Sequence, residues 1–151
     1  MERIKQYWQQ FLADTRKETD TNYLESFCFG SNERMANELL QLVLDGKKKA
    51  TCSSLAYFEG SGESIPKAGD FSIITDWAGK PHAVIQTKQV MILPFKEMTF
   101  DICKREGEDE NLESWQNNHI HFFTEEGEQC GYTFSWEMEV VFEDFEVVYI
   151  K

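Results

Sequence analysis

Apolar residues recur at helical spacing in two segments of the N-terminal third. In the first segment, Glu2–Ala13, the apolar positions are Ile4, Tyr7, Trp8 and Phe11. In the second, about Ser31–Asp45, they are Met35, Leu39, Leu42 and Val43. Both patterns predict amphipathic helices. Ser31 or Asn32 can cap the second helix, and Gly46 suits the left-handed position that ends it. The segments between the helices are a polar connection, Asp14–Asp20, and an aromatic stretch expected to pack irregularly on the core, Tyr23–Phe29.

Beyond Gly46, short apolar stretches alternate with turn residues, which is typical of strands. The stretches compatible with strands are Thr51–Phe58, Phe71–Thr75, His82–Thr87, Gln89–Leu93, Gly131–Trp136, Glu137–Phe142 and Phe145–Ile150. The predicted loops and turns are Glu59–Gly69, Asp76–Pro81, Glu106–Glu110 and Glu143–Asp144. Short helices are expected over Glu97–Arg105 and from Leu112 to about His119, with Asn111 as cap. This order predicts an α+β domain built on a small barrel or a strongly curved sheet.

Length and charge restrict the partners. A chain of 151 residues is expected to form one domain. Its 15 Lys and Arg against 27 Asp and Glu give a net charge of −12, which argues against DNA, long RNA or an anionic membrane as partner. A small basic pocket for one nucleoside or nucleotide is compatible with this charge. The sequence has no membrane span, no secretory signal and four isolated cysteines, so we expect a cytoplasmic protein with reduced thiols.

One basic cluster, Lys47-Lys48-Lys49, follows directly after Gly46, and Thr51 lies three residues beyond Lys48. A neutral lysine amine can take the proton of a hydroxyl and make it a nucleophile. A charged lysine can instead hold a phosphate or stabilise an oxyanion. A solvated charge run near the end of a helix is the simpler interpretation of the same pattern.

Other side chains offer further chemistry. One carboxylate of Glu106–Glu110 can pair with the lysine cluster as a general acid or base, although helix capping also explains this run. His119 and His121 can offer two metal ligands only in an extended segment, and no third ligand stands at a diagnostic spacing, so no metal is expected. Trp77 and Trp115 can stack on a base, although such tryptophans are more often aromatic residues of the core or of its rim. Asp76 stands at a strand end and is a candidate for the rim of a pocket.

Several short motifs follow one another in a characteristic order. They are Phe29-Gly30, Glu38-Leu39, Gly46-x-Lys48-x-Ala50-Thr51, Gly69-Asp70, Pro94-Phe95, Glu106-Gly107-Glu108, Leu112-x-x-Trp115 and Phe122-Phe123. From about Phe27 to the C-terminus the sequence thereby resembles the ASCH domain family, and is similar to its longer bacterial subgroup. The resemblance implies a PUA-like small β-barrel flanked by helices. It also implies a role in RNA metabolism and a single domain over residues 1–151 with an N-terminal helical extension over residues 1–26.

A shorter-chain subgroup of that family hydrolyses N4-acetylcytidine to cytidine and acetate with a Lys, a Thr and a Glu. The resemblance carries these roles to Lys48 as the activating base, Thr51 as the nucleophile and Glu108 as the group that orients or relays the proton. The spacing before Leu112 also allows Glu106 to take the place assigned to Glu108. The residues expected to bind substrate are Lys47, Lys49, Glu106, Asp76 and Trp115, and no cofactor is implied.

The function predicted from the sequence is therefore hydrolysis of a modified nucleoside. Two alternatives stay open, a ribonuclease and a non-catalytic RNA-binding or ligand-sensing module. The partner is accordingly a small-molecule nucleoside or a short RNA.

Overall fold

The computed structural model describes residues 2–151, which form five α-helices, two 3₁₀ helices and five strands. The helices are α1 (Glu2–Asp14), α2 (Glu33–Leu44), α3 (Leu55–Ser61), η1 (Phe95–Glu97), α4 (Phe100–Cys103), η2 (Lys104–Glu106) and α5 (Leu112–Cys130). The strands are β1 (Glu25–Phe27), β2 (Ala50–Ser54), β3 (Phe71–Thr75), β4 (Pro81–Pro94) and β5 (Glu139–Ile150). Within residues 2–151, no helix combines the length and the apolar character needed to cross a membrane.

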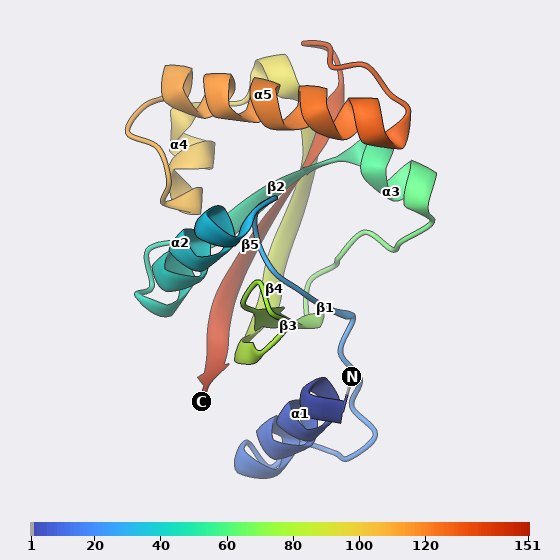
Figure 1. Cartoon of the computed structure of the whole chain (residues 1–151), viewed down its shortest axis with the longest axis vertical. Helices are drawn as coiled ribbons and strands as arrows, with labels where there is room; N and C mark the ends of the chain where they lie inside the picture. The colour runs from blue at the N-terminus through green and yellow to red at the C-terminus, as the bar shows by residue number, and fades with distance from the viewer. Residues whose placement is uncertain (1) are drawn as a thin grey trace.

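The five strands form one curled sheet in the order β1-β3-β4-β5-β2 (Figure 1). β1 runs parallel to β3, and the other neighbours are antiparallel. The long strands β4 and β5 are paired along most of their length, and the register shifts twice between them, at Val84/Ile85 and at Thr87/Gln89. Such irregularities bend and twist a sheet. The result is a half-barrel with β1 and β2 at its edges, which confirms the α+β fold built on a small barrel.

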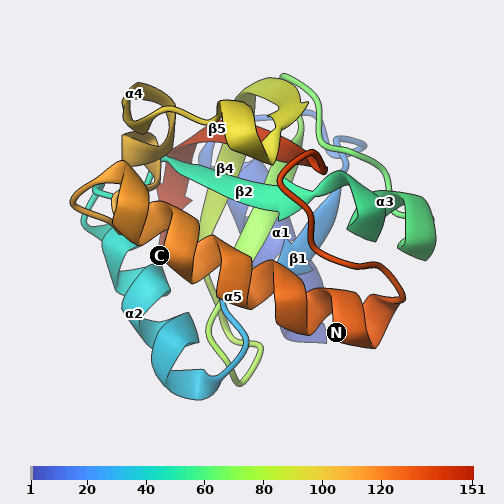
Figure 2. The same ribbon diagram turned by 90° about the horizontal axis from the view of Figure 1, so that it is seen from above.

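Helices pack on the half-barrel in three places. α5 lies across one end of the sheet (Figures 1 and 2). Beneath it lies a cluster of buried residues that includes Phe95, Trp115 and Phe142. α2 covers a second cluster through Leu40 and Val43. α1 lies at the opposite end, where its buried side chains are Ile4, Trp8, Phe11 and Leu12, packed with Ile73 of β3 and Val84 of β4.

The local pattern predicts the N-terminal helices well. α1 and α2 lie within two residues of their expected bounds, and the side chain of Asn32 accepts a hydrogen bond from the Met35 N–H as the N-cap of α2. β3 has the predicted bounds. One member of the expected apolar face differs, because Met35 is 39% exposed and does not belong to the buried side of α2.

Two predicted segments change because of partners that a local pattern does not contain. Tyr23–Phe29 is not irregular throughout, since β1 forms by pairing with β3, which comes 44 or more residues later in the chain. The strand-compatible stretch Thr51–Phe58 becomes helical after Ser54, whose hydroxyl accepts a hydrogen bond from the Tyr57 N–H and caps α3. The predicted loop Glu59–Gly69 therefore begins inside α3.

The second half of the chain needs further corrections. The predicted helix Glu97–Arg105 is divided into η1, α4 and η2. α5 continues well beyond His119 to Cys130, where Gly131 ends it in the left-handed conformation. Gly131–Trp136 is consequently not a strand, because its first residue caps a helix.

The predicted turn at Glu143–Asp144 is wrong. Both residues lie within the continuous strand β5, which replaces the two separate strands expected there. Glu143 accepts a hydrogen bond from the Thr87 hydroxyl (2.7 Å), and Asp144 forms an ion pair with Arg105 (2.9 Å). Buried carboxylates are tolerated in a strand when other elements supply such partners.

Candidate functional site

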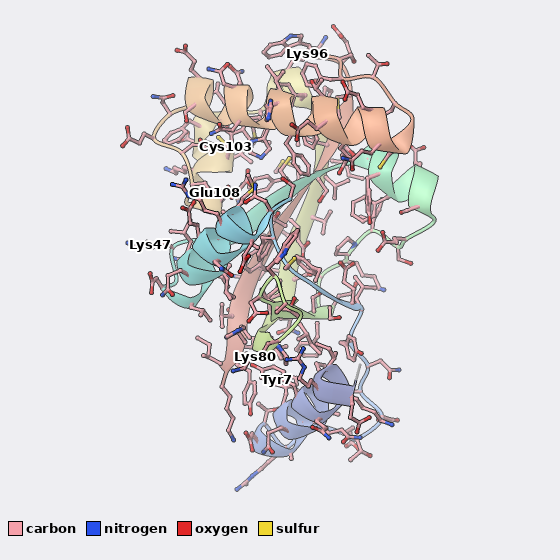
Figure 3. All side chains as sticks on the ribbon, in the orientation of Figure 1. Tyr7, Lys47, Lys80, Lys96, Cys103 and Glu108 are labelled. Carbon is pink, nitrogen blue, oxygen red and sulfur yellow. The ribbon has the colours of Figure 1, made fainter. Side chains whose placement is uncertain are left out.

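The Gly-Lys motif and the Glu-Gly-Glu motif meet through their main chains. α2 ends at Leu44, the chain turns at Gly46, and the Lys49 N–H donates to the Arg105 carbonyl oxygen (3.0 Å). This contact fixes η2 against the residue that precedes β2. In Figure 3, Lys47 and Glu108 accordingly lie on the same side of the molecule, beside α2 and α4. Side chains 60 residues apart in the sequence are thus brought together.

Lys48 is the buried member of the lysine cluster. Its side chain is only 1% exposed, whereas Lys47 and Lys49 are exposed. The Lys48 ammonium donates to the Ala50 carbonyl oxygen (2.8 Å) and to Glu108 Oε2 (2.5 Å). It also lies 3.7 Å from Glu106 Oε1. A buried ammonium requires partners of this kind, so the interpretation as a solvated charge run does not apply to Lys48.

The two carboxylates beside Lys48 have opposite pKa shifts. Burial would raise the pKa of Glu106, but His119 and Lys48 outweigh it and lower that pKa below its usual value. Burial raises the pKa of Glu108 above its usual value, and the charge of Glu106 adds to this effect while Lys48 opposes it. Divergent pKa values in neighbouring groups are typical of acid–base sites. Glu106 is suited to remain ionised, and Glu108 is suited to exchange a proton.

A cavity of about 520 Å³ opens between α2 and α5, next to Lys48. Its polar wall contains Lys48, Thr51, Glu106, Glu108, Asn118 and His119. Its apolar side is lined by Phe29, Met35, Leu39, Leu42 and Phe122. The volume lies within the range of about 300–1,000 Å³ typical of sites for small molecules. The three predicted catalytic residues Lys48, Thr51 and Glu108 therefore border one cavity.

β2 is an edge strand, and its open edge faces away from β5. The Phe145 N–H donates to Lys49 O, and Thr51 pairs with Glu143. In an antiparallel strand, the main-chain N–H and C=O groups of successive residues point alternately toward the paired strand and away from it. Those of Ala50 and Cys52 therefore point to the open edge. The Ala50 carbonyl oxygen accepts a hydrogen bond from the Lys48 ammonium. Cys52 borders the cavity, and burial raises the pKa of its thiol well above the usual value, which makes that sulfur a poor nucleophile.

Four residues expected to bind substrate do not line the cavity. Lys47 and Lys49 are exposed outside it. Asp76 lies in the turn between β3 and β4, where it contacts His82 (3.0 Å) and accepts a hydrogen bond from the Lys80 N–H. Trp115 is fully buried between Phe95 and His119, so its ring faces are already covered. Its indole N–H donates to Glu106 Oε2 (2.5 Å).

His119 is the site residue that the sequence pattern did not assign correctly. The sequence assigns it no role beyond that of a candidate metal ligand in an extended segment, but it lies on α5 one turn after Trp115 and lines the cavity. His121 also borders the cavity, but its side chain is exposed and pairs with Glu125 (3.1 Å). Residues 2–151 contain no group of three His, Cys, Asp or Glu side chains arranged to hold a metal ion. The i, i+4 spacing of Trp115 and His119 was the available signal, because such positions share a helix face.

The curled five-stranded half-barrel with its five α-helices matches the α+β fold of an ASCH domain. The ASCH domain family matches residues 25–149, and the chain belongs to this family. α1 lies before the matched region. ASCH domains are associated with RNA binding.

Two solved structures are similar over nearly the whole chain. A protein from Enterococcus faecalis is 34% identical with a TM-score of 0.90, covering 99% of this chain and 90% of that one. An ASCH domain from Lactobacillus crispatus is 32% identical with a TM-score of 0.89, covering 99% of this chain and 96% of that one. The hypothetical protein PH0355 is 20% identical with a TM-score of 0.53, covering 82% and 98% of the two chains, and shares the fold alone. No curated protein matches the chain.

Proposed function

We propose that this ASCH domain is an amidohydrolase that converts N4-acetylcytidine to cytidine and acetate. The observation that carries the proposal is the 2.5 Å contact between Lys48 Nζ and Glu108 Oε2 in the wall of a cavity that Thr51 also borders. A nucleophile, a basic group and a proton acceptor around one cavity are the parts needed for acyl transfer. The resemblance to the shorter-chain ASCH subgroup supports the choice of substrate.

The first chemical step is attack by Thr51. Lys48 passes a proton to Glu108, whose raised pKa favours the protonated carboxyl, and becomes a neutral amine. The amine takes the hydroxyl proton of Thr51 while Oγ1 bonds to the acetyl carbon of the substrate. The carbonyl oxygen becomes an oxyanion. The main-chain N–H of Cys52, on the open edge of β2 directly after the nucleophile, is the nearest candidate to stabilise it.

The second step releases cytidine. The bond between the acetyl carbon and N4 breaks, and N4 takes the proton that Glu108 received. This leaves an acetyl ester on Thr51. A water molecule then gives one proton to Glu108, and its oxygen attacks the ester carbon. The bond from that carbon to Thr51 Oγ1 breaks, Oγ1 takes the proton back from Glu108, and the acetic acid that leaves loses its remaining proton to solvent as acetate. Glu108 and Lys48 end the cycle with the protons they held at the start.

The cavity supports a small, mostly uncharged substrate. One side is apolar, and its lining carries the acidic side chains Glu38 and Glu125 in addition to Glu106 and Glu108. A phosphate would meet unfavourable carboxylates there, whereas a neutral nucleoside would not. The net charge of −12 also disfavours binding of long RNA, because the acidic protein repels the phosphate backbone.

The test is cytidine release from N4-acetylcytidine, followed by chromatography. We expect release by the wild type and a loss on the order of a thousandfold or more in Thr51→Val and Lys48→Met. Glu108→Gln keeps the shape of the side chain but cannot take a proton, so it should also be severely impaired. Lys88→Met, at an exposed position of β4, serves as the matched control and should retain activity. Full activity in Thr51→Val would overturn the nucleophile, and no release by the wild type would overturn the function.

A second candidate is binding or cleavage of short RNA. It is favoured by the association of ASCH domains with RNA and by the exposed Lys47 and Lys49, which flank the buried Lys48. Exposed lysines beside a nucleotide site contact phosphates and release counterions. If the domain binds short RNA, replacing both lysines with Met should weaken the binding of a short fluorescent RNA and reduce the salt dependence of that binding. If the domain is an N4-acetylcytidine hydrolase, the same double variant should keep its hydrolysis of N4-acetylcytidine.

A further inference from the structure

His119 has an orientation that fixes the roles of its two ring nitrogens. Nδ1 lies 2.8 Å from the Trp115 carbonyl oxygen. A carbonyl oxygen only accepts hydrogen bonds, so Nδ1 must carry a proton. The ring is stacked on Trp115 with centroids 4.1 Å apart, which holds this orientation. The nitrogen left to gain and lose a proton is therefore Nε2.

Nε2 of His119 points toward Glu106. The two groups are 3.6 Å apart, and the side chains of His119 and Glu106 are only 12% and 3% exposed. The other oxygen of Glu106 is occupied by the Trp115 indole. Glu106 Oε1 thus lies between two groups at nearly equal distances, Lys48 Nζ at 3.7 Å and His119 Nε2 at 3.6 Å, and the second is positive only when His119 is protonated.

We propose that His119 is a positioning residue that controls how strongly Glu106 holds the ammonium of Lys48. The proposal rests on the proposed function for its effect on catalysis. When His119 carries its Nε2 proton, it neutralises Glu106, and Lys48 faces only the charge of Glu108. When His119 is neutral, Lys48 alone must compensate both carboxylates. The ammonium is then stabilised, and its transfer of a proton to Glu108 becomes harder.

Charged groups around His119 come from several elements. Those that face it are Glu106 at the end of η2, Glu108 in the following loop and Lys48 before β2, with Glu38 of α2 bordering the same cavity. Burial would lower the pKa of His119, but Glu106 outweighs it, and the pKa is raised above its usual value. Activity is consequently expected to fall as pH rises through the pKa of His119.

The first arm of the test needs no enzyme activity. Nitrogen NMR on ¹⁵N-histidine-labelled protein should show that Nδ1 of His119 stays protonated and that Nε2 titrates at a higher pH than an ordinary histidine. The Lys48 ammonium signal should shift with the same midpoint. Glu106→Gln should lower the midpoint of His119. The proposal would be overturned if Nδ1 of neutral His119 were deprotonated, or if the Lys48 signal did not shift as His119 titrates.

The second arm follows hydrolysis of N4-acetylcytidine against pH. Above the pKa of His119, kcat of the wild type should decline to a lower plateau, because the protonated fraction of His119 falls about tenfold per pH unit and the form with neutral His119 is slower. His119→Gln can still donate to Glu106 but cannot titrate, so it should have a lower kcat without this alkaline decline and with little change in KM. His82→Gln, which lies outside the cavity, should keep the decline.

The two arms separate the failure of this inference from the failure of the proposed function. A wild type that releases no cytidine overturns the function, and the NMR arm still decides whether His119, Glu106 and Lys48 are coupled. A wild type that hydrolyses the substrate, together with a His119→Gln profile that still declines at alkaline pH, overturns the positioning role alone.

Discussion

Gly107 packs its Cα directly against the main chain of Lys47. A Cβ atom at this position would overlap the Lys47 carbonyl oxygen and lie 3.2 Å from the Lys48 nitrogen. Gly107 also has a φ of 73°, a conformation that other residues adopt at a cost. Glu106 and Glu108 are the two neighbours of this contact, so the absence of a side chain at residue 107 allows both carboxylates to reach Lys48.

Gly107→Ala should therefore both destabilise the chain and separate Lys48 from Glu108. The positive φ alone costs about 1–2 kcal/mol, and the overlap adds to this. Gly79→Ala is the matched control, because Gly79 has a φ of 89° with open space around it. Denaturant unfolding should show the larger loss for Gly107→Ala, together with lost hydrolysis. If both variants lost the same free energy of unfolding, the contact between Gly107 and Lys47 would add nothing to the cost of the positive φ.

Removing Lys48 should make stability strongly dependent on pH. In Lys48→Met, Glu108 loses the ammonium that opposes burial, so burial raises its folded-state pKa further above that of the unfolded chain, whereas His119 still stabilises the charge of Glu106. Stability is lost as pH rises through this range. We expect a loss of about 3–5 kcal/mol relative to wild type at pH 8 and a clearly smaller one at pH 5. Urea unfolding at both values checks this, with exposed Lys49→Met as control. A loss independent of pH would point to packing of the lysine stem.

The segments that the sequence predicts well are those whose structure depends on neighbours in the chain. α1 and α2 follow from apolar spacing and from the cap at Asn32. β5 could not be predicted as one strand because Glu143 and Asp144 have the composition of a turn. Their partners Thr87 and Arg105 lie 56 and 39 residues away in the sequence, and only the folded chain brings them together.

The site was predictable only in part, because some of its contacts join residues that are distant in the sequence. The proximity of Lys48 to Glu108 was suggested by motifs and agrees with the structure. The three consecutive lysines are chemically alike, and composition alone does not indicate which one the turn at Gly46 directs inward. The sequence does not indicate that His119 lies beside Glu106, because these two residues are brought together only in the folded chain.

The charge of Glu143 is expected to destabilise the fold, whereas the charge of a carboxylate in an ion pair stabilises it. Burial raises the pKa of this carboxyl, and the hydrogen bond from Thr87 only partly opposes it. Because the folded-state pKa exceeds the unfolded one, ionisation destabilises the fold, and stability falls as pH rises through this range. Glu143→Gln keeps an acceptor for Thr87 without the charge. Its melting temperature should exceed that of wild type at pH 8 and match it at pH 4. Glu146→Gln, exposed in the same strand, should change neither value.

The last prediction concerns α1, which precedes the matched ASCH region. We propose that residues 1–151 unfold as one unit, because Phe11 is fully buried against Phe71 and Tyr149. Phe11→Ala should cost about 3–5 kcal/mol, and exposed Gln9→Ala almost nothing. Tryptophan fluorescence and far-UV circular dichroism should report coincident transitions in wild type and in Phe11→Ala, with the midpoint of the variant lowered for both signals. A variant in which α1 melts early while the rest keeps the wild-type midpoint would show that the helix is a separate appendage.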